Sequence, residues 1–238
     1  MTGAHPRQRP RVICWQINLP DRIENATVKI LDEAEQARAA AMPSPRQRMQ
    51  YISAHVALRQ ILGAHVGAAP AELRFASEAY GRPVLEHAKA PHFSLSHSGR
   101  AAMIALCCEA KIGVDLEQRR PRPKARRLVE RLFAAEEQAA LLPLAETAFA
   151  RAFGRLWVMK EAYIKADGRG LACPLNSFAL DPFAPTVLRN TTGFPSWAQL
   201  SYKGVCNKYD SALVVCSTKT AEIEYRVFDM RGDLYKAA

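Results

Sequence analysis

A chain of 238 residues, 49% of them hydrophobic, can build one large globular domain or two small ones, and no apolar run approaches the ~18 residues of a membrane span. Its Pro- and Arg-rich start lacks the hydrophobic segment of a signal peptide, so we expect a cytoplasmic protein with reduced cysteines. A net charge of +10 favours an acidic partner or substrate, while 8% aromatic residues without basic-aromatic interleaving argue against a nucleic-acid binder.

The N-terminal part of the chain has mixed strand and helix patterns. Residues 1–11 have the composition of a disordered basic lead, and residues 12–17 read as a first strand. A polar connection and an Ala-rich helix follow within residues 21–41. An apolar stripe over residues 47–62 predicts a second helix, with Gly63 as its C-cap. Arg46, Arg48 and Arg59 lie beside or along this stripe; one of them could contact an anionic ligand, and the alternative is that they are solvated or lie over apolar surface.

Three strand patterns follow one another closely. Residues 91–96 alternate in the strand manner, residues 101–108 are continuously apolar, and residues 97–100 make the hairpin between them. Residues 111–117 are then expected as a third adjacent strand. This arrangement brings four polar side chains together at the strand ends: Ser96, His97, Asp115 and Glu117.

Two carboxylates share one face of the third strand. Because side chains alternate along a strand, Asp115 and Glu117 point the same way. Two like charges side by side favour a cation, and Mg²⁺ is the natural oxygen-ligated ion that also binds substrate phosphates. The alternative is the solvated edge of an ordinary sheet.

The remaining chain begins with a basic, Pro-rich connection at residues 119–124. Residues 126–142 are helical with an interruption near 133–134, residues 146–167 form the longest helix, and short strands follow within 177–235. Glu161 and Lys165 lie together at the edge of the long helix's apolar stripe, where a simple ion pair would explain them. Lys160 falls inside the stripe, so it either extends to solvent or meets a buried carboxylate or phosphate.

Cations suited to phosphates, together with acids suited to a metal, are typical of phosphoryl transfer. The chain has neither a P-loop nor a GxGxxG run, which argues against a nucleoside triphosphatase or a Rossmann enzyme. With the motifs below in this order, the chain resembles the 4′-phosphopantetheinyl transferases of the longer, monomeric type named for the surfactin-synthetase activator (Sfp). The motifs are GRP (81–83), FSLSHS (93–98), IGVDLE (112–117), WVMKEAYIK (157–165), and GRGL (168–171) followed by PLNSF (174–178).

The resemblance implies an α+β fold of two similar subdomains about a pseudo-twofold axis, with coenzyme A in the cleft between them. We divide the chain accordingly into the lead at 1–11, an N-terminal subdomain at 12–110 and a C-terminal subdomain at 111–238, which together form one functional domain. The Mg²⁺ ligands implied by the resemblance are Asp115, Glu117 and Glu161. Phosphate charge would be neutralised by Lys165 and Lys160. The 3′-phosphate and adenosine end would be held by Arg82, Ser96, His97 and, among the N-terminal arginines, Arg48.

The reaction implied is attack by a carrier-protein serine on the β-phosphate of coenzyme A, which releases 3′,5′-ADP. Glu161 is the preferred base, with Glu117 or a metal-bound water as the substitute, and Lys165 as a further catalytic residue. Expected partners are acidic apo carrier proteins, with no nucleic acid and no membrane, and the chain is expected to act as a monomer. The alternative function is a non-catalytic coenzyme A or nucleotide-binding module, and a basic nucleic-acid binder is the third.

Overall fold

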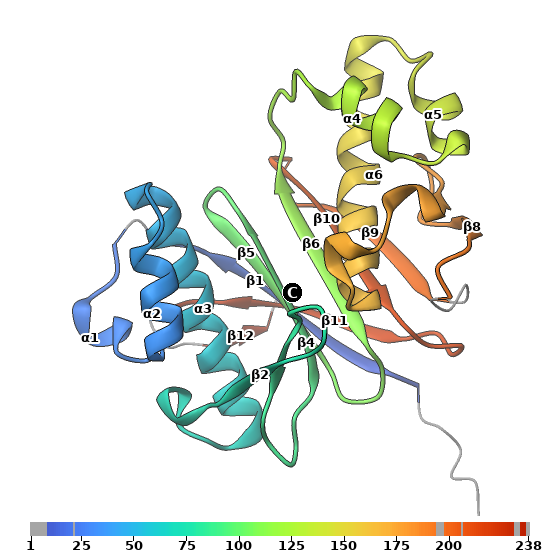
Figure 1. The fold of residues 1–238 in the computed structure, drawn as a ribbon. Helices are drawn as coiled ribbons and strands as arrows, with labels where there is room; N and C mark the ends of the chain where they lie inside the picture. The colour runs from blue at the N-terminus through green and yellow to red at the C-terminus, as the bar shows by residue number, and fades with distance from the viewer. Residues whose placement is uncertain (1–8, 21, 194–197, 206, 231–233, 237–238) are drawn as a thin grey trace, which may run out of the picture.

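The computed structural model describes residues 9–20, 22–193, 198–205, 207–230 and 234–236, and contains two main sheets with a long helix on the outer face of each (Figure 1). The predicted basic lead at residues 1–11 lies largely outside the described residues, and its last residue, Arg11, already belongs to a strand. No helix among the described residues has both the length and the apolar character needed to cross a membrane.

The first sheet has five strands in the order β12-β11-β1-β5-β4. In that order they are Leu234–Lys236, Glu222–Phe228, Arg11–Asn18, Ala101–Cys107 and His92–Ser98. The predicted hairpin is confirmed, since β4 and β5 pair antiparallel and Gly99 adopts a φ of 60° in the turn. Helix α3 (Pro45–Val66) packs on this sheet beside α1 (Asn25–Val28) and α2 (Glu33–Ala40), and the short strands β2 (Phe75–Ser77) and β3 (Pro83–Leu85) form a separate pair.

The second sheet has three strands in the order β6-β10-β9, which are Ile112–Gln118, Tyr209–Val215 and Gln199–Val205. Helix α6 (Glu146–Asp167) packs on it, and the two short helices α4 (Ala125–Leu132) and α5 (Ala135–Leu141) confirm the predicted break at residues 133–134. Strands β7 (Phe178–Leu180) and β8 (Val187–Asn190) form a small hairpin nearby. The 3₁₀ turns are η1 (Pro70–Glu72), η2 (Gly170–Ala172) and η3 (Leu175–Ser177).

The two main sheets share a core, so the order of layers is α3, first sheet, second sheet, α6. Strand β5 shows why its sequence is apolar without alternation: it is covered on both faces. One set of its side chains packs with α3 and the other with the second sheet; the first set is Ala102, Ile104 and Leu106, and the second is Ala101, Met103, Ala105 and Cys107. The structure is therefore a mixed α/β fold with a junction between two sheets.

Strand β6 is adjacent to β4 and β5, as predicted, but it forms its backbone ladder with β10, so residues 112–118 begin the second sheet. One sequence prediction about these elements is wrong. Helix α3 continues past Gly63 to Val66, and Gly67 makes the C-cap with a φ of 75°. A Cβ on Gly63 would lie 2.7 Å from the Ala68 carbonyl oxygen, so Gly63 permits close packing rather than a helix end.

The division of the chain at residues 110 and 111 stays a prediction. The second half, however, contributes two strands to the first sheet, because β11 pairs parallel with β1, from Arg11 opposite Glu222 to Ile17 opposite Phe228, and β12 pairs with β11. The C-terminal part of the chain therefore completes the first sheet on the side of β1 away from β5.

Candidate active site at the junction of the two sheets

Serines on one face of β4 connect the first sheet to β6. Ser96 Oγ donates to Asp115 Oδ1 at 2.7 Å, and Ser98 Oγ donates to Glu117 Oε2 at 2.9 Å. Ser94 Oγ accepts a hydrogen bond from the backbone of β6. Because residues two apart share a strand face, this serine series holds the two acids of β6 beside β4 without a backbone ladder.

Asp115 lies at the centre of the site and is only 4% exposed. Its Oδ1 atom accepts from Ser96 and lies 2.6 Å from Lys165 Nζ on α6. Its Oδ2 atom is buried and has no hydrogen-bond partner. A buried carboxylate oxygen without a donor is costly, so this atom is suited to a cation.

Glu117 lies nearer the surface than Asp115. Besides the hydrogen bond from Ser98, its Oε2 atom pairs with Arg122 at 2.9 Å, and Arg122 also lies over the Trp157 ring at 5.7 Å. The basic connection after β6 therefore folds back over this acid.

Glu161 reaches the same region from α6. Burial raises the pKa of its carboxyl group above the usual value, and the negative charges of Asp115 and Glu117 raise it further, while Lys165 lowers it. A carboxylate with a raised pKa beside two others is typical of a group that accepts a proton or binds a cation.

The acids of this site supply part of the ligand set that Mg²⁺ requires. Within the described residues, no three His, Cys, Asp or Glu side chains form a complete metal-binding group. Mg²⁺ usually takes one or two protein carboxylates and fills its other positions with water and substrate phosphate. The unpartnered Oδ2 of Asp115, near Glu117 and Glu161, fits such a partial site.

A cavity of about 740 Å³ adjoins the acids and is lined in part by Arg82, His97 and Lys165. Arg82 Nη atoms donate weakly to the carbonyl oxygens of Ala166 at 3.3 Å and Ile112 at 3.4 Å. Burial lowers the pKa of Arg82, but a guanidinium stays protonated in proteins. The long helix α6 ends at the cavity, where Gly168 has a φ of 93° and confirms the predicted end.

His97 lies in this cavity as a neutral ring. Burial lowers its pKa to about 4, and the nearby charges of His55 and Lys165 act in the same direction. At neutral pH the imidazole therefore offers one N–H donor and one acceptor, so it can contact phosphate by hydrogen bonding rather than by charge.

The opposite wall of the cavity was not predicted. It is lined by residues of α2 and α3, among them Glu35, Arg38, Tyr51 and His55. His55 Nδ1 lies 3.1 Å from Glu35 Oε1, and its ring stacks on Tyr51 with centroids 4.0 Å apart. The pattern of Asp32 followed three residues later by Glu35 marks the start of α2, where both side chains form a capping box, but it does not indicate a cavity.

Two residues predicted to contact phosphate are not among the residues that line this cavity. Lys160 is fully buried on the other side of α6, where its Nζ lies 2.6 Å from Glu137 Oε1. Of the surroundings that the sequence allowed for Lys160, the structure therefore shows the buried carboxylate. Arg48 donates to the carbonyl oxygens of Ala39, Ala40 and Met42, so it caps the end of α2 and does not line the cavity.

The other two N-terminal arginines are also outside the cavity lining. Arg59 is fully buried and pairs with Asp32 at 2.5 Å and Glu35 at 2.6 Å. Arg46 lines a separate, smaller pocket of about 360 Å³. Arg38 is the arginine of this region that lines the large cavity.

Comparisons with known proteins point to one family. Residues 111–214 match the family model described as the 4′-phosphopantetheinyl transferase superfamily. The 4′-phosphopantetheinyl transferase HetI of Nostoc sp. is 33% identical over 78% of this chain and 80% of its own length. The 4′-phosphopantetheinyl transferase Sfp of Bacillus subtilis is 32% identical over 52% of this chain and 54% of its own length.

A solved structure, the holo-[acyl-carrier-protein] synthase of Thermotoga maritima, aligns with 46% of this chain and 64% of that chain. The identity is 25% and the TM-score is 0.36, which is too low to compare the two folds.

Proposed function

This chain belongs to the 4′-phosphopantetheinyl transferase superfamily, and from this premise we propose that it transfers the 4′-phosphopantetheine moiety of coenzyme A to a serine hydroxyl of an apo carrier protein. The observation that carries the proposal is the double position of Lys165. Its ammonium contacts Asp115, and its side chain also lines the large cavity. One cation thus connects a cluster of acids to a space of the size that cofactors occupy.

The proposal includes the arrangement of the halves. We take the α3 layer with the first sheet and the α6 layer with the second sheet as two similar halves about a pseudo-twofold axis, with the substrate between them. Each half has a 22-residue helix packed on its sheet, which supports this reading.

Coenzyme A would lie in the cavity with its phosphates toward Lys165. Arg82 and His97 would contact the 3′-phosphate and adenosine end, and Arg38 takes the place first given to Arg48 because it lines the same cavity. Ser96 is 7% exposed and donates to Asp115, so we assign it to holding the acid rather than to touching the substrate.

Mg²⁺ would be held by Asp115 and Glu117 with Glu161 as the third acid, and when bound it would neutralise charge on the pyrophosphate of coenzyme A. Lys165 adds a second positive charge on the same side, because its Nζ lies 2.6 Å from Asp115 Oδ1 and its side chain lines the cavity.

In the reaction, the carrier serine oxygen forms a bond to the β-phosphorus of coenzyme A, and the pyrophosphate P–O bond breaks. The 3′,5′-ADP leaves with the bonding electron pair, and the hydroxyl proton passes to a base. Glu161 is the base in this proposal, since its raised pKa brings it closer to the working pH than an exposed glutamate. Glu117 is the alternative base, although its pairing with Arg122 favours a fixed carboxylate.

The carrier partner is expected to be acidic. The net charge of +10 would steer a negatively charged protein toward this chain. Action as a monomer in the cytoplasm stays a prediction.

The reaction is tested by incubating the protein with coenzyme A, Mg²⁺ and an apo carrier protein, and measuring 3′,5′-ADP by chromatography. We expect one ADP for each carrier modified and none in EDTA. Binding of coenzyme A without ADP release from any carrier would instead indicate the non-catalytic binding module.

Two arginines test where coenzyme A lies. Arg82→Ala should raise the KM for coenzyme A about tenfold or more, because a charge-assisted contact with phosphate contributes roughly 1.5–3 kcal/mol. The matched control Arg48→Ala should leave KM unchanged, since Arg48 caps α2. Steady-state kinetics with coenzyme A and with dephospho-coenzyme A measure both. An equal loss for the two substrates would place Arg82 away from the 3′-phosphate.

A further inference from the structure

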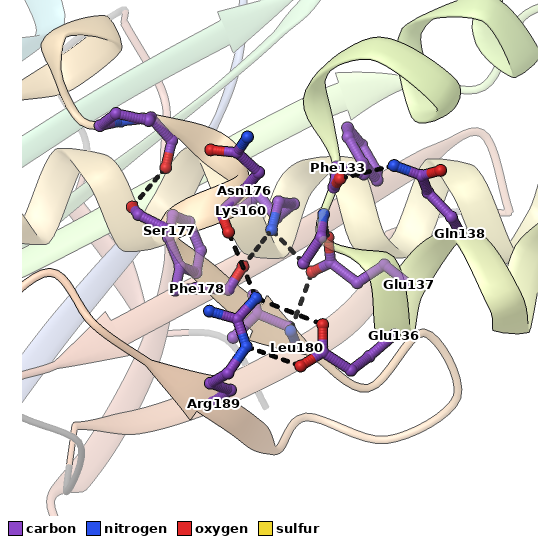
Figure 2. Close-up of polar contacts among 12 residues, drawn as sticks. Phe133, Glu136, Glu137, Gln138, Lys160, Asn176, Ser177, Phe178, Leu180 and Arg189 are labelled. Carbon is purple, nitrogen blue, oxygen red and sulfur yellow. Dashed lines mark hydrogen bonds and ion pairs between the residues drawn. The ribbon is translucent and has the colours of Figure 1, made fainter.

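Lys160 and Glu137 form a charged pair with no exposure to solvent (Figure 2). Lys160 Nζ donates to Glu137 Oε1 at 2.6 Å and to the Phe178 carbonyl oxygen at 3.0 Å. The ammonium also lies over the rings of Phe178, at 4.0 Å from the centroid, and Phe133, at 5.3 Å. Burial lowers the pKa of Lys160, and the charge of Glu137 offsets part of this effect, so that the pKa is about 8.

The carboxylate of Glu137 is equally well held. Its Oε1 atom also accepts from the Leu180 N–H at 2.9 Å, and its Oε2 atom accepts from the Ala134 N–H at 3.0 Å. The pair therefore joins three elements, α5, α6 and β7, as Figure 2 shows. Replacing such a pair by apolar residues is often neutral or stabilising, so stability alone does not account for it.

The position of the pair on α6 relates it to the candidate active site. Lys160 directly precedes Glu161, and successive side chains on a helix diverge by about 100°. Glu161 and Lys165, four residues apart, share the face toward Asp115, while Lys160 is fixed on a different face. A rotation of α6 by about 20° would move the Glu161 carboxylate by about 2 Å.

A second contact holds the opposite face of α6. The helix backbone lies so close to β6 that a Cβ on Gly113 would be 2.1 Å from the Ala162 carbonyl oxygen and 2.4 Å from the Ala166 nitrogen. The contact at Gly113 sets how near α6 approaches β6. It holds one face of the helix, and the Lys160–Glu137 pair holds another.

We propose that Lys160 and Glu137 are positioning residues for phosphopantetheinyl transfer: their ion pair fixes the rotation of α6 so that Glu161 and Lys165 face Asp115. The inference rests on the proposed function, and it gives Lys160 a role without contact to coenzyme A.

The test is the double variant Glu137→Gln/Lys160→Met. Either single neutral substitution leaves an unpaired buried charge, whereas the double variant removes both charges and keeps an amide oxygen for one of the two backbone N–H groups, those of Leu180 and Ala134, that donate to Glu137. We expect its Tm to stay within about 5 °C of the parent. We also expect kcat to fall about 10–100-fold and the KM for coenzyme A to rise by a smaller factor, because Lys165 turns with α6 whereas Arg82 lies just before β3.

The matched control is Glu136→Gln/Arg189→Met. This neighbouring ion pair, at 2.6 Å, also starts on α5 but is exposed, and its hydrogen bonds in the described part of the chain go to β8 and Asn176 rather than to α6, so only its charges act on Lys160. The control should keep the kcat of the parent. The same kcat loss in both double variants would overturn the positioning role.

A second measurement separates this inference from the proposed function. Mn²⁺ titrations followed by electron paramagnetic resonance, with coenzyme A present and no carrier, should show weaker Mn²⁺ binding in the Glu137→Gln/Lys160→Met variant than in the parent. A parent that binds Mn²⁺ but modifies no carrier would contradict the proposed function, and the comparison of affinities would still test positioning.

Should the double variant unfold, Glu137→Asp serves in its place. It keeps the charge but shortens the side chain by one methylene, so the pair can persist only if α6 shifts. We expect a several-fold loss of kcat and weaker Mn²⁺ binding. Parent values for both quantities in a folded Glu137→Asp protein would overturn the proposal.

Discussion

Asp115→Asn should lower the rate of Mg²⁺-dependent transfer at least about 100-fold while the protein stays folded. Groups that only support a metal ligand typically contribute 10–100-fold, so a ligand itself should contribute at least as much. Asparagine has the same shape and keeps an oxygen for the Ser96 hydroxyl, but it lacks the negative charge that would hold a cation. Transfer rates measured at increasing Mg²⁺ concentrations test the loss of activity, and thermal unfolding tests whether the variant stays folded.

The control for Asp115 is Ser96→Ala. This variant removes the hydrogen bond at 2.7 Å but leaves the carboxylate in place, so we expect a smaller loss, of roughly tenfold. Near-normal transfer by a folded Asp115→Asn protein would contradict the proposal that Asp115 is a metal ligand.

Glu161→Gln should lower kcat about 10²- to 10⁴-fold, which is the usual contribution of a general base. The pH profile gives a sharper readout. A base acts only when deprotonated, so transfer by the parent should fall as the pH drops through the pKa of Glu161. Without a metal ion, burial and the charges of Asp115 and Glu117 raise that pKa above the usual 4.5, and Mg²⁺ held by the same acids would lower it, so the fall should move to lower pH as the Mg²⁺ concentration rises. In Glu161→Gln this acidic limb should disappear from the residual rate.

Glu146→Gln is the matched control for this pH profile. Glu146 lies on the same helix, its side chain is 83% exposed, and its pairing with Arg126 at 3.3 Å is remote from the acids of β6. We expect parental rates and a parental pH profile. An unchanged acidic limb in Glu161→Gln would assign the titration to another group, with Glu117 as the first to examine.

Local sequence patterns predicted turns and helix ends well where a single glycine provides the required backbone conformation. Gly99 permits the left-handed turn of the β4–β5 hairpin, and Gly168 ends α6 for the same reason. At Gly63 the same reasoning was wrong, because that glycine meets the Ala68 carbonyl oxygen inside a continuous helix. A glycine's role depends on what lies against it, and the sequence does not contain that information.

The acids of the candidate site follow from strand alternation, but their neighbours do not. Asp115 and Glu117 share a face in any strand, whichever sheet it joins, so their common orientation does not depend on the pairing of β6 with β10. Ser98 and Arg122 required the observed junction between sheets, since each reaches Glu117 through tertiary packing.

The choice among cations shows the same limit. Lys160 and Lys165 both lie on α6, yet one is enclosed by Glu137 and the other lines the cavity. The sequence stripe left Lys160 with three possible surroundings, and only the partner on α5 decides between them. Arg38 and Arg48 differ in a similar way, because the end of α2 needs a donor for its carbonyl oxygens and Arg48 supplies it.

The most direct measurement is the intact mass of an acidic apo carrier protein after incubation with this protein, coenzyme A and Mg²⁺. The account predicts a gain of one phosphopantetheine group, located on the carrier serine, that is lost in EDTA and absent when that serine is alanine. An unchanged carrier mass across several apo carriers, with coenzyme A bound to this protein, would contradict the transfer reaction itself.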